Sequence, residues 1–181
     1  MNIAVIGWGS LIWDSRKLDI EPEWHADGPK LPIEFARVSK GDRLTLVLVD
    51  GAPLQKTLWA KSRKTTLADA VKDLQAREGT SEQNIGRWAA TKTMTSHGLG
   101  EVPIISAWAT NHTLDGVVWT ALGPKRPDGN NGLASNDEYI GYLNSLVANE
   151  RDQAAREYIE NAPVQIDTPM RRRIRETFGW K

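Results

Sequence analysis

The chain has 181 residues, of which 23 are Lys or Arg, 23 are Asp or Glu and none is Cys. This length suits one domain over residues 1–181, the balanced charge gives no overall field that would attract nucleic acid, and the lack of cysteine excludes disulfides and thiolate chemistry. No apolar run approaches the roughly 20 residues of a membrane helix, and the first residues lack the charged segment of a signal peptide. We therefore expect a cytoplasmic protein whose partner is neither membrane nor nucleic acid.

The first predicted element is a buried strand at 3–6, which runs into a Gly-x-Gly-Ser turn. Glycine allows positive φ or a close approach to a ligand, so three interpretations of the turn stay open. It is a plain strand end, a dinucleotide fingerprint, or a nest of N–H groups that binds a carboxylate or a developing oxyanion. The fingerprint lacks its third glycine, because Ile12 stands there. The residues of the nest would be Gly7, Trp8, Gly9, Ser10 and Leu11.

Strands dominate the part of the chain that follows an irregular segment at 14–32. Apolar and polar residues alternate at 33–38, and an apolar run occupies 44–49, so that these two stretches predict a hairpin. Residues 55–61 predict one further strand.

The next predicted element is a helix that follows Thr65 or Thr66 and stops at Gly79. Apolar residues recur at positions 67, 70, 71 and 74, which places them on one face. Thr65 or Thr66 would serve as N-cap, and Gly79 ends the helix as a C-cap.

The rest of the chain adds further helices and strands. Residues 81–90 predict a short helix, and 91–100 form a polar loop that contains His97. Strands are expected at 102–110 and 116–122. Three helices follow: one opened by the capping box Ser135–Glu138, one at about 151–161, and one that begins with Thr168 as N-cap and Pro169 as N1. Strands first, helices later and no regular βαβ alternation predict an α+β fold.

Glu78 is the candidate for acid–base chemistry. At 100° per residue it returns to within about 20° of Leu67 on the apolar face. Burial and the negative end of the helix dipole both favour a protonated carboxyl, and a carboxyl poised nearer to neutral pH is the better general base. The alternative is that Glu78 reaches solvent or pairs with Arg77 or Arg87.

Two other features are weaker candidates. The three histidines lack HxxH or HExxH spacing, so no metal site is expected. The basic run at 171–175 has acidic residues on both sides, and we expect a solvated helix face there rather than a nucleic-acid site.

Two motifs resemble those of the gamma-glutamylcyclotransferase-like superfamily. Its members carry a Tyr-Gly-Ser-Leu/Asn turn after the first strand, which Trp8–Leu11 matches, and a Glu at the end of the first long helix, which Glu78 matches. Ile12-Trp13 continues the turn as in members that act on glutathione, and Tyr139 matches a Tyr that faces the site. Trp8 replaces the family Tyr, which removes a phenol and leaves the backbone N–H groups.

The resemblance implies a small mixed, partly closed β-barrel with flanking helices. It also implies a reaction in which the α-amine of a γ-glutamyl amide or peptide attacks its own γ-carbonyl, giving 5-oxoproline and an amine or peptide. Glu78 would be the general acid/base, and the turn with Tyr139 would bind the small-molecule substrate, without a metal or organic cofactor. The alternative is a non-catalytic member of the same fold that binds a small ligand or regulates.

Overall fold

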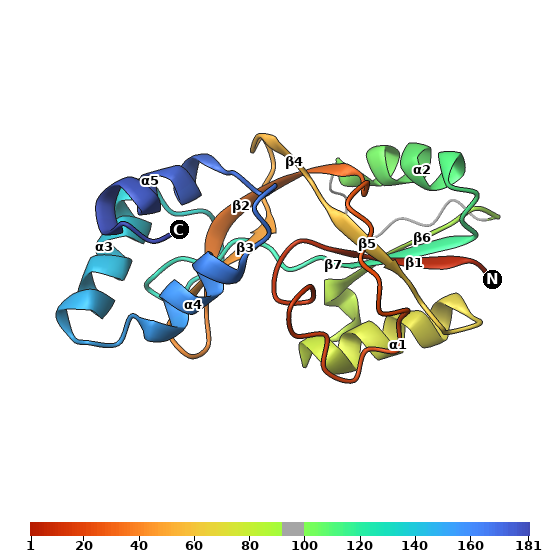
Figure 1. Ribbon diagram of the computed structural model, residues 1–181, viewed down its shortest axis with the longest axis horizontal. Helices are drawn as coiled ribbons and strands as arrows, with labels where there is room; N and C mark the ends of the chain where they lie inside the picture. The colour runs from red at the N-terminus through yellow and green to blue at the C-terminus, as the bar shows by residue number, and fades with distance from the viewer. Residues whose placement is uncertain (92–99) are drawn as a thin grey trace. The chain divides into compact units, whose positions relative to one another are not determined.

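The computed structural model in Figure 1 describes residues 1–91 and 100–181. Over these ranges the chain forms two β-sheets and five α-helices, which confirms the predicted α+β class. It divides into two compact units, one of Met1–Leu31 with Lys56–Leu122 and one of Pro32–Gln55 with Gly123–Lys181. The expectation of a single domain stays a prediction, and each unit is described by itself. No helix in the described ranges combines the length and hydrophobicity needed to cross a membrane.

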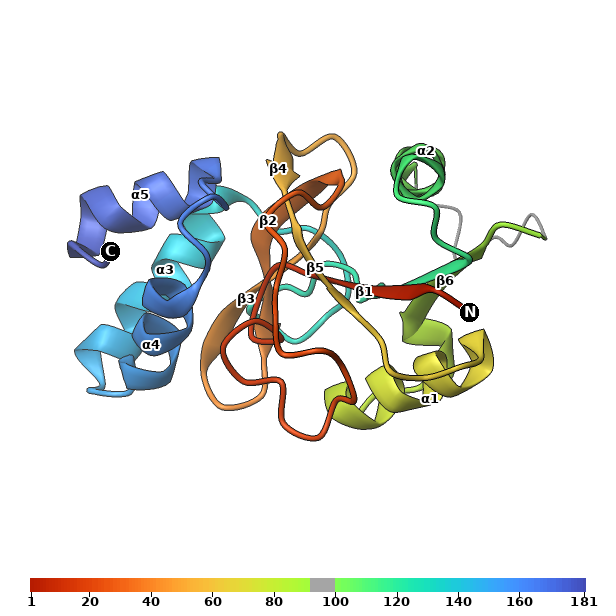
Figure 2. The same cartoon turned by 45° about the vertical axis from the view of Figure 1, so that its right-hand side comes forward.

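The first unit is built on a four-stranded sheet with the order β5-β1-β7-β6. Its strands are β1 (Ile3–Gly7), β5 (Leu58–Lys61), β6 (Ile85–Ala89) and β7 (Gly116–Thr120). β1 runs parallel to β7 and antiparallel to β5, while β6 runs antiparallel to β7. Figures 1 and 2 show α1 (Leu67–Glu78) and α2 (Glu101–Asn111) on opposite faces of this sheet. Both faces of β1 are therefore covered, which fits its five fully buried residues.

Helix α1 has the predicted bounds and caps. Its apolar face packs in a cluster with residues of the sheet, which include Ile3, Val5, Ile85 and Val118. Thr66 caps the N-terminus by accepting a hydrogen bond from the Asp69 N–H at 3.2 Å. Gly79 ends the helix with a φ of 59°, the left-handed region that glycine enters without steric cost.

The predicted strand at 102–110 is wrong, because these residues belong to α2. Their β-branched and aromatic content favours a strand, but the buried positions Ile105, Trp108 and Ala109 follow the i, i+3, i+4 spacing of a helix face. Pro103 lies in the first turn, where its missing N–H costs no helical hydrogen bond.

The predicted short helix at 81–90 is also wrong for most of its length. Only Glu82–Asn84 are helical, as the 3₁₀ turn η1, and the rest forms β6. Gly86 explains the difference: a Cβ there would lie 2.1 Å from the Trp119 ring of the neighbouring strand. A glycine inside a strand often marks such a close approach.

The second unit contains most of a three-stranded sheet with the order β3-β2-β4. Its strands are β2 (Lys30–Ser39), β3 (Arg43–Leu48) and β4 (Leu54–Lys56), and its helices are α3 (Asn136–Ala148), α4 (Gln153–Asn161) and α5 (Pro169–Phe178). β2 and β3 form the predicted antiparallel hairpin, with Ile33 opposite Leu48. Helix α4 packs on β3.

The strands do not close into the partly closed barrel that the resemblance implied. The stretch predicted as one strand at 55–61 is two short strands, β4 and β5, which belong to different sheets. The interruption lies at Thr57, which is fully buried and whose hydroxyl donates to the Pro29 carbonyl at 2.7 Å. The backbone of Thr57 also pairs with Gly28 and Pro29, and the described strands on its two sides belong to different sheets.

Candidate functional site

The turn after β1 is closed by its own backbone. The Ile12 N–H donates to Gly9 at 3.0 Å, and the Asp14 N–H donates to Ser10 at 2.9 Å. Within residues 1–91 and 100–181, the N–H groups of Ser10 and Leu11 donate to no other residue. Leu11 is 5% exposed, and its side chain belongs to the core cluster of the unit.

Gly7 is required by packing rather than by positive φ. It ends β1, and a Cβ there would lie 2.8 Å from the Trp24 ring and 2.9 Å from the Ile12 side chain. Trp8, the next residue, is 5% exposed and so lies in the interior of the unit.

Glu78 lies at the end of α1 with 15% of its side chain exposed. Its Oε1 accepts a hydrogen bond from Arg77 Nη1 at 2.6 Å, which is the ion pair that the sequence left open as an alternative. In the part of the chain that the structure describes, Oε2 accepts no hydrogen bond. One oxygen of the carboxylate is therefore held in place, and the other is available to take a proton.

Arg77 connects Glu78 to the turn, and the sequence reasoning missed it. Its side chain is only 4% exposed, less than that of Glu78. Its Nη2 donates to Ser10 Oγ at 3.2 Å and to the Asp14 carbonyl at 2.5 Å. The structure therefore brings Glu78 and Ser10 to the same guanidinium. The sequence contained a signal for the burial of Arg77, because this residue follows Leu74 by three positions and so lies on the same helix face.

Tyr139 belongs to the second unit, so its predicted contribution to the substrate site stays a prediction. It is 1% exposed, and burial raises its pKa above the ordinary value. Its hydroxyl donates to the Ala36 carbonyl at 2.6 Å and accepts from the Ala134 N–H at 3.3 Å. These contacts tie the start of α3 to β2.

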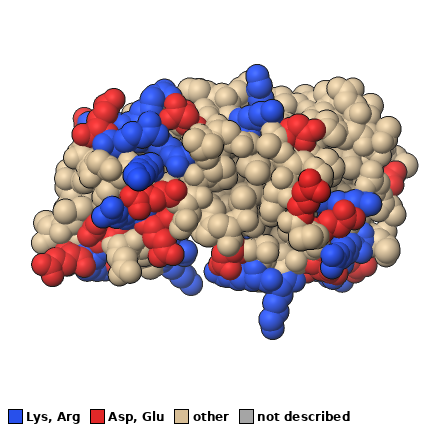
Figure 3. All heavy atoms as spheres, viewed as in Figure 1, with Lys and Arg blue, Asp and Glu red and all other residues tan. Residues whose placement is uncertain are grey.

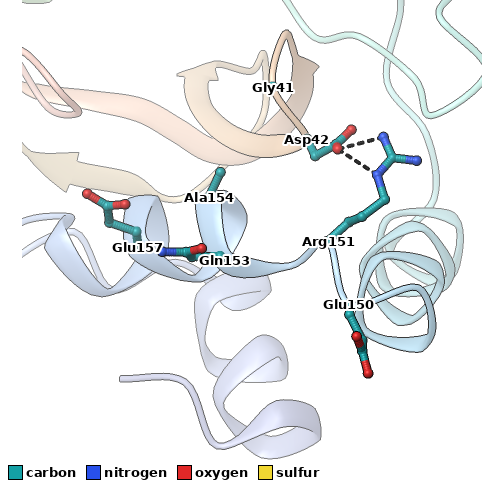
Figure 4. Close-up of a pocket in the computed structure, with 7 residues that line it drawn as sticks. All are labelled: Gly41, Asp42, Glu150, Arg151, Gln153, Ala154 and Glu157. Carbon is teal, nitrogen blue, oxygen red and sulfur yellow. Dashed lines mark hydrogen bonds and ion pairs between the residues drawn. The ribbon is translucent and has the colours of Figure 1, made fainter.

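A pocket of about 320 Å³ lies in the second unit and contains none of the predicted site residues. Figure 4 shows it between the β2–β3 turn and the start of α4, lined by Gly41, Asp42, Glu150, Arg151, Gln153, Ala154 and Glu157. Asp42 Oδ2 accepts hydrogen bonds from Arg151 Nη2 at 2.6 Å and Nε at 3.0 Å. The positively charged side chain at this pocket, that of Arg151, is therefore paired with Asp42.

The basic run at 171–175 is engaged in contacts within the second unit. Arg171 is 5% exposed and donates to four carbonyls, those of Ile159, Ala162, Pro163 and Ile166. Arg172 and Arg175 pair with Asp167, and Arg173 pairs with Asp137. On the face drawn in Figure 3, positive and negative side chains lie next to one another.

Two predictions concern histidines and metals. His97 lies outside the described residues. In the ranges that are described, no group of three or more His, Cys, Asp and Glu side chains has an arrangement that could hold a metal ion.

Compared with models of protein families, with curated proteins and with solved structures, the chain gives no match. The resemblance to the gamma-glutamylcyclotransferase-like superfamily therefore stays a prediction that depends on the turn and on Glu78.

Proposed function

We propose that the first unit cyclises a γ-glutamyl amide or peptide to 5-oxoproline, with Glu78 as general acid/base. One observation supports this proposal best. A single buried guanidinium, that of Arg77, binds both the Glu78 carboxylate at 2.6 Å and the Ser10 hydroxyl at 3.2 Å. A proton acceptor and a turn with two N–H groups that no described residue accepts are thereby held in one place.

The chemistry needs these two parts. Glu78 takes a proton from the α-ammonium of the substrate, and the freed amine attacks the γ-carbonyl carbon, forming a C–N bond. The N–H groups of Ser10 and Leu11 stabilise the negative charge that develops on the carbonyl oxygen. Glu78 passes the first proton to the leaving nitrogen and takes a second proton from the ring nitrogen. The carbonyl re-forms as the bond to the leaving nitrogen breaks, and the second proton is returned to the released amine, which departs as an ammonium ion. The substrate supplies its own nucleophile, so no cysteine or activated serine is required.

A direct test measures 5-oxoproline release by mass spectrometry from a panel of γ-glutamyl amines, γ-glutamyl peptides and glutathione. We expect Glu78→Gln to lower kcat by at least about 100-fold, because it removes the group that accepts the proton.

Glu82→Gln is the matched control. Glu82 also accepts a hydrogen bond from an arginine, Arg87, at 2.6 Å, but its side chain is 51% exposed. This variant should keep wild-type turnover. Wild-type turnover in Glu78→Gln would contradict the proposal.

The second candidate is a site that binds a small ligand without turning it over. The observation in its favour is that one Glu78 oxygen is already occupied by Arg77. It predicts that 5-oxoproline or glutathione raises Tm while no compound of the panel is cleaved.

A further inference from the structure

Asp27 lies in the segment at 21–29, which leads to the start of β2. Three side chains contact this residue. Its Oδ1 accepts a hydrogen bond from the Trp59 indole N–H at 2.8 Å, and its backbone carbonyl accepts one from the Trp108 indole at 2.9 Å. Its Oδ2 lies 3.2 Å from Nε2 of His112. The segment is therefore joined through one residue to both β5 and α2.

Both ring nitrogens of His112 face oxygen atoms. Nδ1 lies 3.0 Å from the Trp108 carbonyl oxygen, and Nε2 faces the Asp27 carboxylate. Both partners are oxygens that only accept hydrogen bonds. A neutral imidazole has one N–H and can satisfy one of them, whereas an imidazolium has two and satisfies both. His112 is also the C-cap residue of α2, where the helix dipole favours a positive charge.

Asp27 is the charged group in contact with His112. Among the described residues, the rings of Trp59 on β5 and Trp108 on α2 also lie close to it, at centroid distances of 5.8 and 4.8 Å. The His25 ring is tilted against that of Trp59, with a centroid distance of 4.6 Å, and Glu23 lies 3.9 Å from its Nδ1, so His25 lies one ring further away. The hydrogen bond from Trp59, followed by that from His112, lowers the pKa of Asp27 below its ordinary value. Asp27 is thus ionised wherever a histidine titrates.

The same segment reaches the turn of the candidate site. Trp24 places its ring 2.8 Å from where a Cβ of Gly7 would lie, so that it covers the end of β1. His25 exchanges two backbone hydrogen bonds with Trp59, at 2.8 and 3.0 Å.

We propose that His112 and Asp27 form a proton-dependent clasp that joins the segment at 21–29 to the end of α2 while His112 is charged. As the pH rises and His112 loses its proton, one of its two hydrogen bonds and the ion pair are lost together. Stability contributed by the clasp is present at the acid end of the histidine range and disappears toward the alkaline end. The clasp follows from the contacts of His112 alone and does not depend on the cyclotransferase proposal.

The test compares the Tm of the full chain and of His112→Gln from about pH 5.5 to about pH 8, the range of histidine titration. Because Asp27 is 61% exposed, solvent screens the pair and the effect is modest. The Tm of wild type minus the Tm of the variant should be larger at the acid end than at the alkaline end, by roughly 1–3 °C. A difference that stays constant across this range overturns the proposal.

Two further variants make the result specific. Asp27→Asn removes the carboxylate at constant size and should abolish the same pH-dependent difference, which also provides the test if His112→Gln does not fold. His25→Gln removes the neighbouring histidine and should retain the wild-type pH dependence. If His25→Gln abolishes it instead, His112 is not the switch.

A second measurement follows the segment directly. In ¹H–¹⁵N spectra, the indole N–H resonances of Trp59 and Trp108 should shift together with pH in wild type and stay in place in His112→Gln. Indole resonances that are insensitive to pH in wild type contradict the clasp. Neither measurement uses turnover, so a failure of the proposed enzyme activity leaves this test unaffected.

Discussion

Arg77 is the buried charge on which the candidate site depends. Its guanidinium donates to Glu78, to Ser10 and to the Asp14 carbonyl, and its side chain is 4% exposed. A planar guanidinium can serve three acceptors at fixed angles, which an ammonium group cannot do. Arg77 is therefore a positioning residue, because it acts on the substrate through Glu78 and the turn.

We expect Arg77→Met to lower kcat by about 10- to 100-fold with little change in KM, because small displacements of catalytic groups have effects of that size. Arg77→Lys should recover only part of the loss. Steady-state kinetics on the best substrate of the panel provides the measurement.

Arg87→Met is the control, since Arg87 forms a more exposed pair with Glu82. It should behave as wild type. Equal losses of kcat in the Arg77 and Arg87 variants would show that the effect is not specific to the site.

Glu101 is a second buried ionisable residue, at the start of α2. It is 1% exposed, and its Oε1 has no hydrogen-bond partner among the described residues. Burial raises its pKa above the ordinary 4.5, because the charged form loses its hydration. Such a group stabilises the fold below its unfolded-state pKa, and this contribution is lost as the pH rises through the folded-state pKa.

Glu101→Gln should therefore be more stable than wild type at pH 8, by about 1 kcal/mol or roughly 2–4 °C in Tm. The advantage should shrink as the pH falls, because the Glu101 carboxyl becomes protonated and is then neutral like the glutamine side chain. Thermal unfolding at several pH values, with the exposed Glu82→Gln as reference, measures the difference. A variant that is less stable at every pH would mean that the fold uses the charged carboxylate.

At the scale of elements, helix starts can be predicted where a side chain closes the first turn. Ser135 Oγ accepts from the Glu138 N–H at 3.2 Å, and Glu138 Oε2 accepts from the Ser135 N–H at 2.9 Å, as the capping box of α3 predicts. Thr168 does the same for α5 by accepting from the Arg171 N–H at 3.1 Å. These signals act within four residues, so the sequence is sufficient to recognise them.

Ser135→Ala should lower the stability by about 1 kcal/mol, or roughly 2–4 °C in Tm, because the N-terminal N–H groups of α3 lose their acceptor. Asp152→Ala at the start of α4 is the matched comparison, since the Asp152 side chain makes no capping hydrogen bond. Its Tm should stay within about 1 °C of wild type. Thermal unfolding followed by circular dichroism distinguishes the two.

Where local signals conflict, the elements could not be predicted. Residues 102–110 have a strand-like composition, yet Trp108 and Ala109 are buried on a helix that covers the sheet. Residues 85–89 form a strand because β7 pairs with them and Trp119 needs the space above Gly86. In both cases the partner element, which lies elsewhere in the chain, decides the conformation.

At the scale of the whole molecule, the α+β class followed from the order of the predicted elements, but the division of strands between sheets did not. Thr57, which lies between β4 and β5, is hydrogen-bonded to Pro29, 28 positions away. The equal numbers of acidic and basic residues are also visible in the sequence. Their pairing, such as that of Arg173 with Asp137, required the packing of α5 near α3.

The sequence by itself determined the hairpin of β2 and β3, the extent of α1 and the caps of three helices. These features depend on side-chain alternation and on contacts between residues three or four positions apart. Only the tertiary structure decided that Arg77, which binds Glu78, also binds Ser10, a residue 67 positions before Arg77. The same is true of the contact between Asp27 and His112, which are 85 positions apart. The physical reason is that a buried polar group must find a partner, and the partner is chosen by which distant segments pack together.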